Sequence, residues 1–218
     1  MDFSRLIPAP SDRALFAGQT GSGKTTLARE LLSHREYVVV LDGKGTIDWP
    51  GYERATTLQH LYDSHPEKQP RLIFRPDYAT LANERAMDDF FRWVYDRRRT
   101  TLYVDETASV TRGDIFPFHY GACLMRGRER GVEVWSATQR PMRIPIIAQS
   151  EAEHAYIFRL RMPQDRQRIE QTTGIDADDI ARLDKHFFLY APQDGEIMGP
   201  HTLTFHGSQA PAQSAPAA

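Results

Sequence analysis

The stretch that most constrains this chain is Gly18-Gln19-Thr20-Gly21-Ser22-Gly23-Lys24-Thr25-Thr26. It lies between a short apolar run at residues 14–17 and a helix-like segment at residues 27–32. A glycine, four residues and Gly-Lys-Thr, placed between a strand and a helix, form the pattern of a phosphate-binding loop. The stretch therefore predicts an α/β fold in which this loop lies at the end of a buried strand.

Each residue type in this stretch has a chemical reason to be there. Glycines let backbone N–H groups curl around a polyphosphate without Cβ clashes, and the following helix points its positive end at the same place. We expect Lys24 to neutralise β- and γ-phosphate charge and the Thr25 hydroxyl to ligate Mg²⁺. The alternative is a glycine-rich turn with a stray lysine. The flanking strand and helix favour nucleotide binding by Gly18, Gln19, Thr20, Gly21, Ser22, Gly23, Lys24, Thr25 and Thr26.

Composition sets limits on the remaining classes of function. The 218 residues carry a net charge of −2, so a nucleic-acid contact would have to be local. Cys123 is the single cysteine, which excludes an intrachain disulfide and a cysteine zinc cluster. The sequence contains neither an apolar run of about 18 residues nor the apolar region of a signal peptide. We expect a cytoplasmic protein.

The order of segments predicts one domain with two short extensions. Residues 1–12 form an N-terminal arm, 13–206 the domain, and 207–218 a disordered tail of Ser, Gln, Ala and Pro. Apolar runs predict strands at 13–17, 37–42, 71–74, 101–104, 132–138, 155–160 and 187–190, with an edge strand near Ile197. Helices are predicted up to residue 33 and over 57–64, 81–99, 119–130, 163–173 and 176–183. This alternation predicts a mostly parallel sheet with helices on both faces.

Two adjacent carboxylates, Asp105 and Glu106, follow the apolar run Leu102-Tyr103-Val104. An acidic residue at the end of a buried strand is the expected second half of a nucleotide site, so Asp105 is the candidate to hold Mg²⁺. Glu106 can polarise a water for in-line attack on the γ-phosphate. The alternative is a strand that simply meets a polar loop. Downstream of the Lys24 loop, we favour the catalytic interpretation.

Gln139 and three arginines complete the candidate set. Gln139 follows the strand predicted at 132–138, whose carboxyl end would lie beside the phosphates. Its amide could donate to the γ-phosphate or orient water, and an ordinary loop glutamine is an equal alternative. Arg126, Arg128 and Arg130 could supply a cation to the transition state in cis or from a neighbouring subunit. A solvated helix face is the alternative for them.

These residues carry a family resemblance. Residues 127–141, GRERGVEVWSATQRP, closely resemble the segment of the FtsK/HerA DNA-pumping ATPases in which an arginine-bearing helix leads into a strand ending Ala-Thr-Gln-Arg-Pro. The turn at 42–45 is similar to that family's Asp-Pro-Lys-Gly turn, with Gly43 in place of the proline. The resemblance covers about residues 13–190 and implies a RecA-like (ASCE) P-loop NTPase fold. It also implies that Gln139 senses the γ-phosphate and that Arg128 is the best candidate for a finger acting across a subunit interface.

The chain lacks the membrane helices and the winged-helix domain of the family's large members. It is most similar to the small genome-packaging ATPases of tailless, membrane-containing DNA viruses, with a prophage or plasmid-mobilisation relative as the alternative. This implies ATP and Mg²⁺ as cofactors and a hexameric or pentameric ring that moves double-stranded DNA. It further implies a capsid or membrane vertex protein as docking partner, and a place in the host cytoplasm or on the virion. Residues 44–52 and 107–117 are candidate channel loops by position.

Two other classes of function stay open. A P-loop small-molecule kinase would transfer phosphate to an acceptor other than water, but Glu106 and the segment 138–141 favour water. A phage morphogenesis ATPase of the zonula-occludens-toxin type, or a conjugation-coupling ATPase, would share the loop. The toxin type usually carries a membrane span, which the sequence lacks. The guanine-binding and ABC-transporter signatures are absent.

Overall fold

The computed structural model describes residues 3–65 and 68–202 of the chain. The tail predicted at 207–218 lies outside the described residues. The strands are β1 (Ala14–Ala17), β2 (Val38–Leu41), β3 (Glu53–Ala55), β4 (Arg71–Phe74), β5 (Thr100–Val104), β6 (Val132–Thr138), β7 (His154–Phe158), β8 (Phe187–Pro192) and β9 (Met198–Thr202). The α-helices are α1 (Lys24–Leu32), α2 (Leu58–Tyr62), α3 (Tyr78–Ala82), α4 (Glu84–Arg97), α5 (Phe118–Arg126), α6 (Ile147–Ser150), α7 (Pro163–Thr173) and α8 (Ala177–Arg182).

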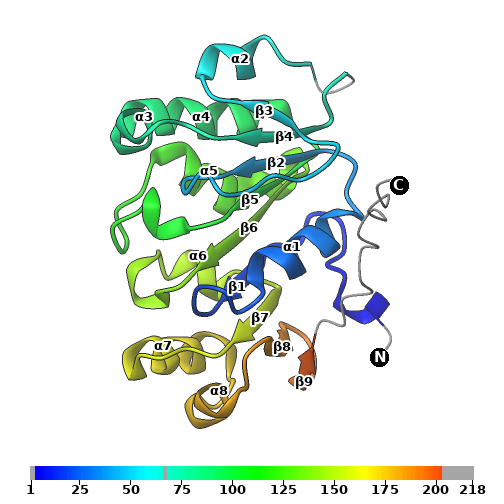
Figure 1. Cartoon of the computed structure of the whole chain (residues 1–218), viewed down its shortest axis with the longest axis vertical. Helices are drawn as coiled ribbons and strands as arrows, with labels where there is room; N and C mark the ends of the chain where they lie inside the picture. Colours follow the sequence, from blue (N-terminus) through cyan, green and yellow to red (C-terminus); the bar gives the residue numbers. More distant parts are fainter. Residues whose placement is uncertain (1–2, 66–67, 203–218) are drawn as a thin grey trace, which may run out of the picture.

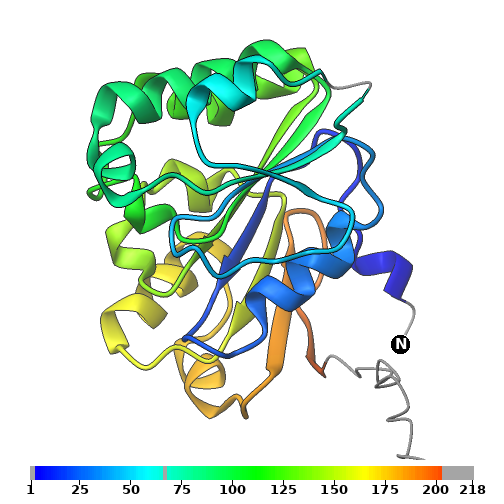
Figure 2. The ribbon, with the colours of Figure 1, turned by 45° about the horizontal axis from the view of Figure 1, so that its top comes forward.

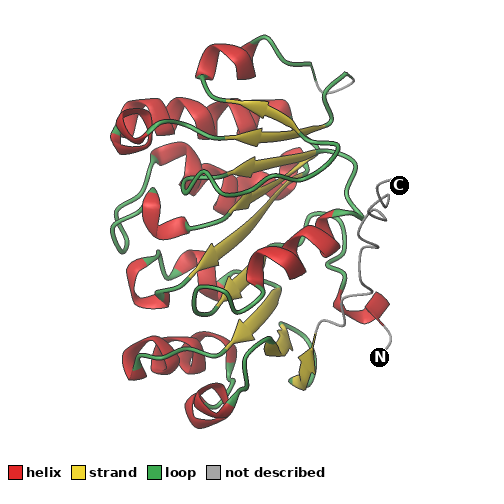
Figure 3. Ribbon diagram, viewed as in Figure 1, coloured by secondary structure: helices red, strands yellow, loops and turns green. Residues whose placement is uncertain are grey.

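The nine strands form one sheet in the order β3-β4-β2-β5-β6-β1-β7-β8-β9 (Figures 1 and 3). Every pairing from β3 to β7 is parallel, whereas β8 and β9 are antiparallel to their neighbours. The predicted α/β fold with a mostly parallel sheet is therefore confirmed. Since β1 lies between β6 and β7, the loop that follows it has neighbouring strands on both sides.

Alternation along the central strands divides the core between two faces of the sheet. In β2, Val38 and Val40 pack with Leu27 of α1, whereas Val39 and Leu41 pack with Phe90 of α4. Helices α7 and α8 cover the other end of the α4 face through a third cluster of buried side chains. Helices therefore lie on both faces of the sheet, as Figure 2 shows from a second direction. None of the helices in the described part is long and apolar enough to cross a membrane.

The N-terminal segment contributes to the core on the α1 face. A short 3-10 helix, Phe3–Leu6, buries Leu6 to 1% exposure against this face. The Tyr156 hydroxyl donates to the Leu6 carbonyl oxygen. Residues 3–12 are thus attached to the sheet at β7.

Two elements differ from their predicted bounds for local reasons. The helix predicted over 81–99 is two helices, because Asn83 is extended and its side chain accepts from the Ala86 amide to cap α4 at 3.1 Å. The helix predicted over 119–130 ends at Arg126 and continues as a 3-10 turn over Gly127–Arg130. A Cβ on Gly127 would lie 2.5 Å from the Val132 carbonyl oxygen, so only glycine fits where this turn meets β6.

Candidate active site

The carboxyl ends of three adjacent strands bring the predicted site residues together. Strands β5, β6 and β1 are neighbours, and they are followed by Asp105-Glu106, Gln139 and Gly18 respectively. In a parallel sheet these ends open on the same edge, where ligands of α/β proteins bind. The sequence prediction that these segments meet is confirmed by the topology.

The glycine-rich loop has the backbone that a phosphate cradle requires. Gly21 has φ of 72° and Gly23 has φ of 110°, in the left-handed region where a Cβ is strained. A Cβ on Gly18 would lie 2.5 Å from the Cβ of Phe158 on β7. Helix α1 begins at Lys24 with Gly23 as its N-cap, so no side chain satisfies its first N–H groups. These donors and the helix dipole point to an anion.

Lys24 is a buried cation held by carbonyl oxygens of its own loop. Lys24 is 6% exposed, and its Nζ donates to the carbonyl oxygens of Gly18 at 2.7 Å and Gln19 at 2.9 Å. Burial lowers the Lys24 pKa to about 8, an effect that Glu106 opposes and Lys44 reinforces. A buried ammonium without a carboxylate in direct contact suits a phosphate ligand.

Thr25 and Asp105 face each other across the site. The Thr25 hydroxyl donates to Oδ1 of Asp105 at 2.7 Å, and the Tyr103 hydroxyl donates to the same oxygen at 3.1 Å. Burial and the neighbouring Asp105 carboxylate raise the Tyr103 pKa well above its usual value, so Tyr103 stays a neutral donor. Oδ1 is thereby fixed, and Oδ2 of Asp105 faces Lys44 at 3.6 Å.

Glu106 is held in the same way at one oxygen. Its Oε1 accepts from the Thr138 hydroxyl at 3.1 Å and from the backbone amide of Gln139 at 3.3 Å, so the end of β6 positions the Glu106 carboxylate. Its Oε2 lies 3.3 Å from Lys44 Nζ. Lys44 therefore neutralises the outward-facing oxygen of both carboxylates. The sequence did not predict this contact, although the turn at 42–45 directly follows the strand predicted at 37–42.

A divalent cation fits the donors that this edge offers. The described residues contain no cluster of three or more His, Cys, Asp or Glu side chains that could hold a metal by themselves. Thr25 and Asp105 present two oxygens, which matches Mg²⁺ sites that take their remaining ligands from phosphates and water.

Gln139 connects the phosphate loop to β6. Its Oε1 accepts from the Thr20 hydroxyl at 2.6 Å, so the side chain bridges two of the predicted segments. The next residue, Arg140, pairs with the buried carboxylate of Asp165 on α7 at 2.7 Å. This ion pair fixes the segment after β6 on the body of the domain and leaves Gln139 directed at the loop.

Arg128 lies away from the phosphate loop of its own chain. Arg128 precedes β6 and Gln139 follows it, so the two residues lie at opposite ends of this strand. Arg128 Nη2 is 3.3 Å from Asp12 and 3.4 Å from Glu153, and its side chain is 64% exposed. Arg130 pairs with Asp96 at 3.4 Å. Neither Arg128 nor Arg130 can contact a phosphate bound at residues 18–26 of the same subunit.

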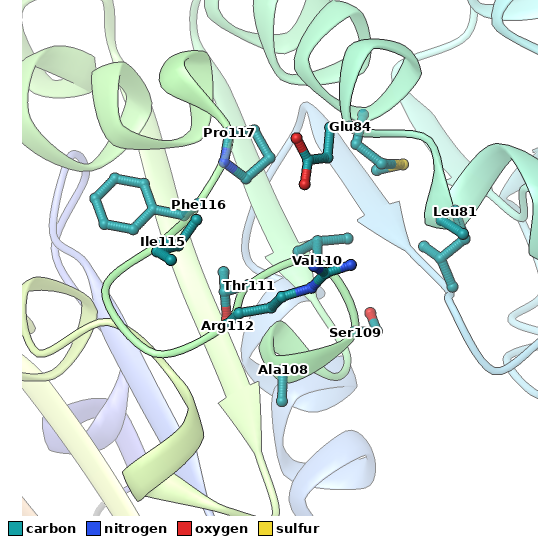
Figure 4. A pocket seen from close by; sticks show the side chains of 12 residues that line it. Leu81, Glu84, Ala108, Ser109, Val110, Thr111, Arg112, Ile115, Phe116 and Pro117 are labelled. Carbon is teal, nitrogen blue, oxygen red and sulfur yellow. The ribbon is translucent and has the colours of Figure 1, made fainter.

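The segment after Glu106 lines a groove beside the site. Residues 108–112 and 115–117 line it from one segment, and Leu81, Ala82, Glu84 and Met87 line it from another (Figure 4). The groove has a volume of about 170 Å³ and includes Arg112 and Glu84 among its lining side chains. One of the two candidate channel loops, 107–117, therefore begins directly at the catalytic edge. Its role in contacting a polymer remains a prediction.

Comparison with known proteins shows which proteins the chain is similar to. No family profile matches the chain. The DNA packaging ATPase P9 of Enterobacteria phage PRD1 is 25% identical over 178 residues, which cover 80% of this chain and 75% of that protein. The chain is a homologue of a viral DNA packaging ATPase. The predicted resemblance to small genome-packaging ATPases of the FtsK/HerA type is thus confirmed.

Two solved structures have a fold similar to that of this chain. The genome packaging NTPase B204 of Sulfolobus turreted icosahedral virus 2, in complex with ATP-γS, matches with a TM-score of 0.71 at 16% identity, over 90% of this chain and all of that one. The pCW3 conjugation coupling protein TcpA matches with a TM-score of 0.57 at 17% identity, over 89% of this chain and 59% of that one. The chain therefore shares the fold of these nucleotide-binding proteins, a mostly parallel sheet with helices on both faces.

Proposed function

We propose that this chain is an ATPase that hydrolyses ATP to ADP and phosphate and uses the energy to package double-stranded DNA into a virus particle. One observation carries the proposal. Lys24, Asp105, Glu106 and Gln139 meet at one edge of the sheet, in a chain that is homologous to a DNA packaging ATPase.

The phosphate loop would bind the triphosphate with its backbone N–H groups and Lys24. Lys24 now donates to two carbonyl oxygens, so the ammonium has only to turn from these to the β- and γ-phosphates. The Thr25 hydroxyl and Asp105 would hold Mg²⁺, which neutralises phosphate charge when it is bound. Residues 18–26 thereby act as the nucleotide-binding segment.

Glu106 would act as the general base. Two donors hold its Oε1, so Oε2, which is paired with Lys44 at 3.3 Å, is the oxygen that would accept a proton from a water aimed at the γ-phosphate. The backbone amide of Gln139 donates to Glu106, and its side-chain oxygen accepts from Thr20 in the phosphate loop. It is therefore placed to report on the γ-phosphate to both segments, as a sensor would.

The finger cation implied by the family resemblance, Arg128, would have to come from a neighbouring subunit. Arg128 lies at the opposite end of β6 from Gln139, with a side chain that is 64% exposed. If subunits join in a ring, the turn before β6 in one subunit could face the phosphate loop of the next subunit and supply Arg128 as a finger. We accordingly propose a ring of six or five subunits around the DNA, assembled in the host cytoplasm and docked on a capsid or membrane vertex protein.

The products of the reaction test the proposal against the kinase alternative. Purified protein should release ADP and inorganic phosphate in equal amounts, and Lys24→Ala should release neither. Production of ADP without free phosphate in the presence of a small acceptor would instead make the chain a kinase.

A further inference from the structure

Two hollows flank the phosphate loop, and His186 lines both of them together with Gly21 and Ser22 of the loop. The first, of about 220 Å³, lies between residues 19–22, Arg159 and the turn at 184–186. The second, of about 190 Å³, lies between residues 21–26 and the same turn. His186 is the member of that turn that contributes to both hollows. A nucleotide bound on residues 18–26 would therefore have His186 beside it.

The antiparallel end of the sheet places this turn at the site. Strand β8 pairs antiparallel with β7, and Phe158 at the end of β7 lies opposite Phe188 near the start of β8. The turn before β8 consequently reaches the edge where the parallel strands end. The Phe187 amide donates to the Asp184 carbonyl at 3.2 Å and closes the turn, while the Gln19 amide donates to the Arg159 carbonyl at 3.2 Å.

His186 has two properties that its own fold does not explain. Its φ is 70°, a left-handed conformation that is uncommon for a residue other than glycine. Its Nδ1 is buried and has no hydrogen-bond partner among the described residues, and the same is true of Ser22 Oγ in the phosphate loop. Burying a polar atom without a partner costs free energy, so both atoms suit a ligand that fills the hollows.

We propose that His186 contacts the nucleoside part of the bound nucleotide and that its Nδ1 hydrogen-bonds to that ligand. The inference rests on the proposed function, because it requires a nucleotide on residues 18–26. It adds the part of the site that the loop cannot supply, since the loop recognises phosphates whatever they are attached to. Asp184 lines the same hollow as Arg159 and Lys185, so a polar nucleoside would have both donors and an acceptor around it.

Two substitutions separate the effect of the His186 imidazole from the effect of its backbone conformation. His186→Gly removes the imidazole and relieves the left-handed backbone, so the melting temperature without nucleotide should not fall. His186→Asn keeps a polar side chain that tolerates this conformation. ATP-γS should bind to His186→Gly about tenfold more weakly than to the wild type, the effect of losing one hydrogen bond and its contacts, and His186→Asn should lose less. His34→Gly, at an exposed residue outside the site, is the control.

Inorganic tripolyphosphate provides the decisive comparison because it has no nucleoside. Calorimetry should show that tripolyphosphate binds equally well to the wild type and to His186→Gly, while ATP-γS does not. Equal losses for both ligands would place His186 in support of the phosphate loop and overturn the inference, as would an unchanged ATP-γS affinity. If neither ligand binds to the wild type, the proposed function itself fails.

Discussion

Binding of a nucleotide to this protein should take up a proton at alkaline pH, because of Lys24. Burial lowers the Lys24 pKa from 10.5 to about 8 in the nucleotide-free site, although the Glu106 and Asp105 carboxylates oppose the shift. Phosphates placed against the ammonium would add several negative charges and raise this pKa again. The protein must therefore protonate Lys24 when it binds a nucleotide above about pH 8.

The size of the effect follows from the titration of one group. With a pKa of about 8, Lys24 is charged in about nine-tenths of the molecules at about pH 7 and in about one-tenth at about pH 9. The apparent affinity for ADP or ATP-γS should accordingly fall about tenfold between these two pH values. In the absence of nucleotide, the unfolded chain binds the extra proton between about pH 8 and 10.5. The contribution of Lys24 to stability therefore rises with pH across that window.

Calorimetry in two buffers of different ionisation enthalpy measures the proton directly. At about pH 9 the wild type should take up about 0.9 proton per ADP bound, and at about pH 7 about 0.1. Lys24→Arg is the matched control because a guanidinium does not titrate in this range, so it should show neither this uptake nor the pH dependence. An affinity of the wild type that stays constant from about pH 7 to 9 would refute the reasoning, because Lys24 would then be fully charged before the nucleotide arrives.

Three further substitutions test the roles of single residues. Glu106→Gln should keep ATP binding and lower turnover by about 100- to 10,000-fold, measured as phosphate release; retained turnover would remove Glu106 as the base. Lys44→Met removes the ammonium group that lies 3.6 Å from the Asp105 carboxylate and 3.3 Å from the Glu106 carboxylate. It should tighten Mn²⁺ binding to the nucleotide-free protein about tenfold by electron paramagnetic resonance, with exposed Lys68→Met as control. Arg128→Ala should abolish turnover, and an excess of Lys24→Ala subunits should restore part of it; no restoration would argue against a finger in trans.

The sequence predicted that the candidate site residues would lie together because the phosphate loop and the carboxylates are local signals at strand ends. Residues 18–26, Asp105-Glu106 and Gln139 each follow an apolar run, and parallel pairing then brings them together without further information. The strands Arg71–Phe74 and Val132–Thr138 were predicted with their observed bounds, since the turn residues Pro70 and Gly131 stand directly before them.

What the sequence could not show depends on contacts between distant segments. Strand β3 (Glu53–Ala55) is polar and was not predicted, because an edge strand needs only one hydrogen-bonded neighbour. The turn at 184–186 reaches the site through the antiparallel pairing of β8, which no local pattern fixes. The bridge from Lys44 to both carboxylates likewise requires the order of β2 next to β5.

Hydrolysis of ATP with and without double-stranded DNA tests the central claim most directly, with the shape of the particle measured in the same solution. The account predicts that the protein assembles into closed rings and that double-stranded DNA raises the rate of phosphate release by these rings. Rings whose rate of hydrolysis does not change when double-stranded DNA is added would contradict a DNA packaging motor.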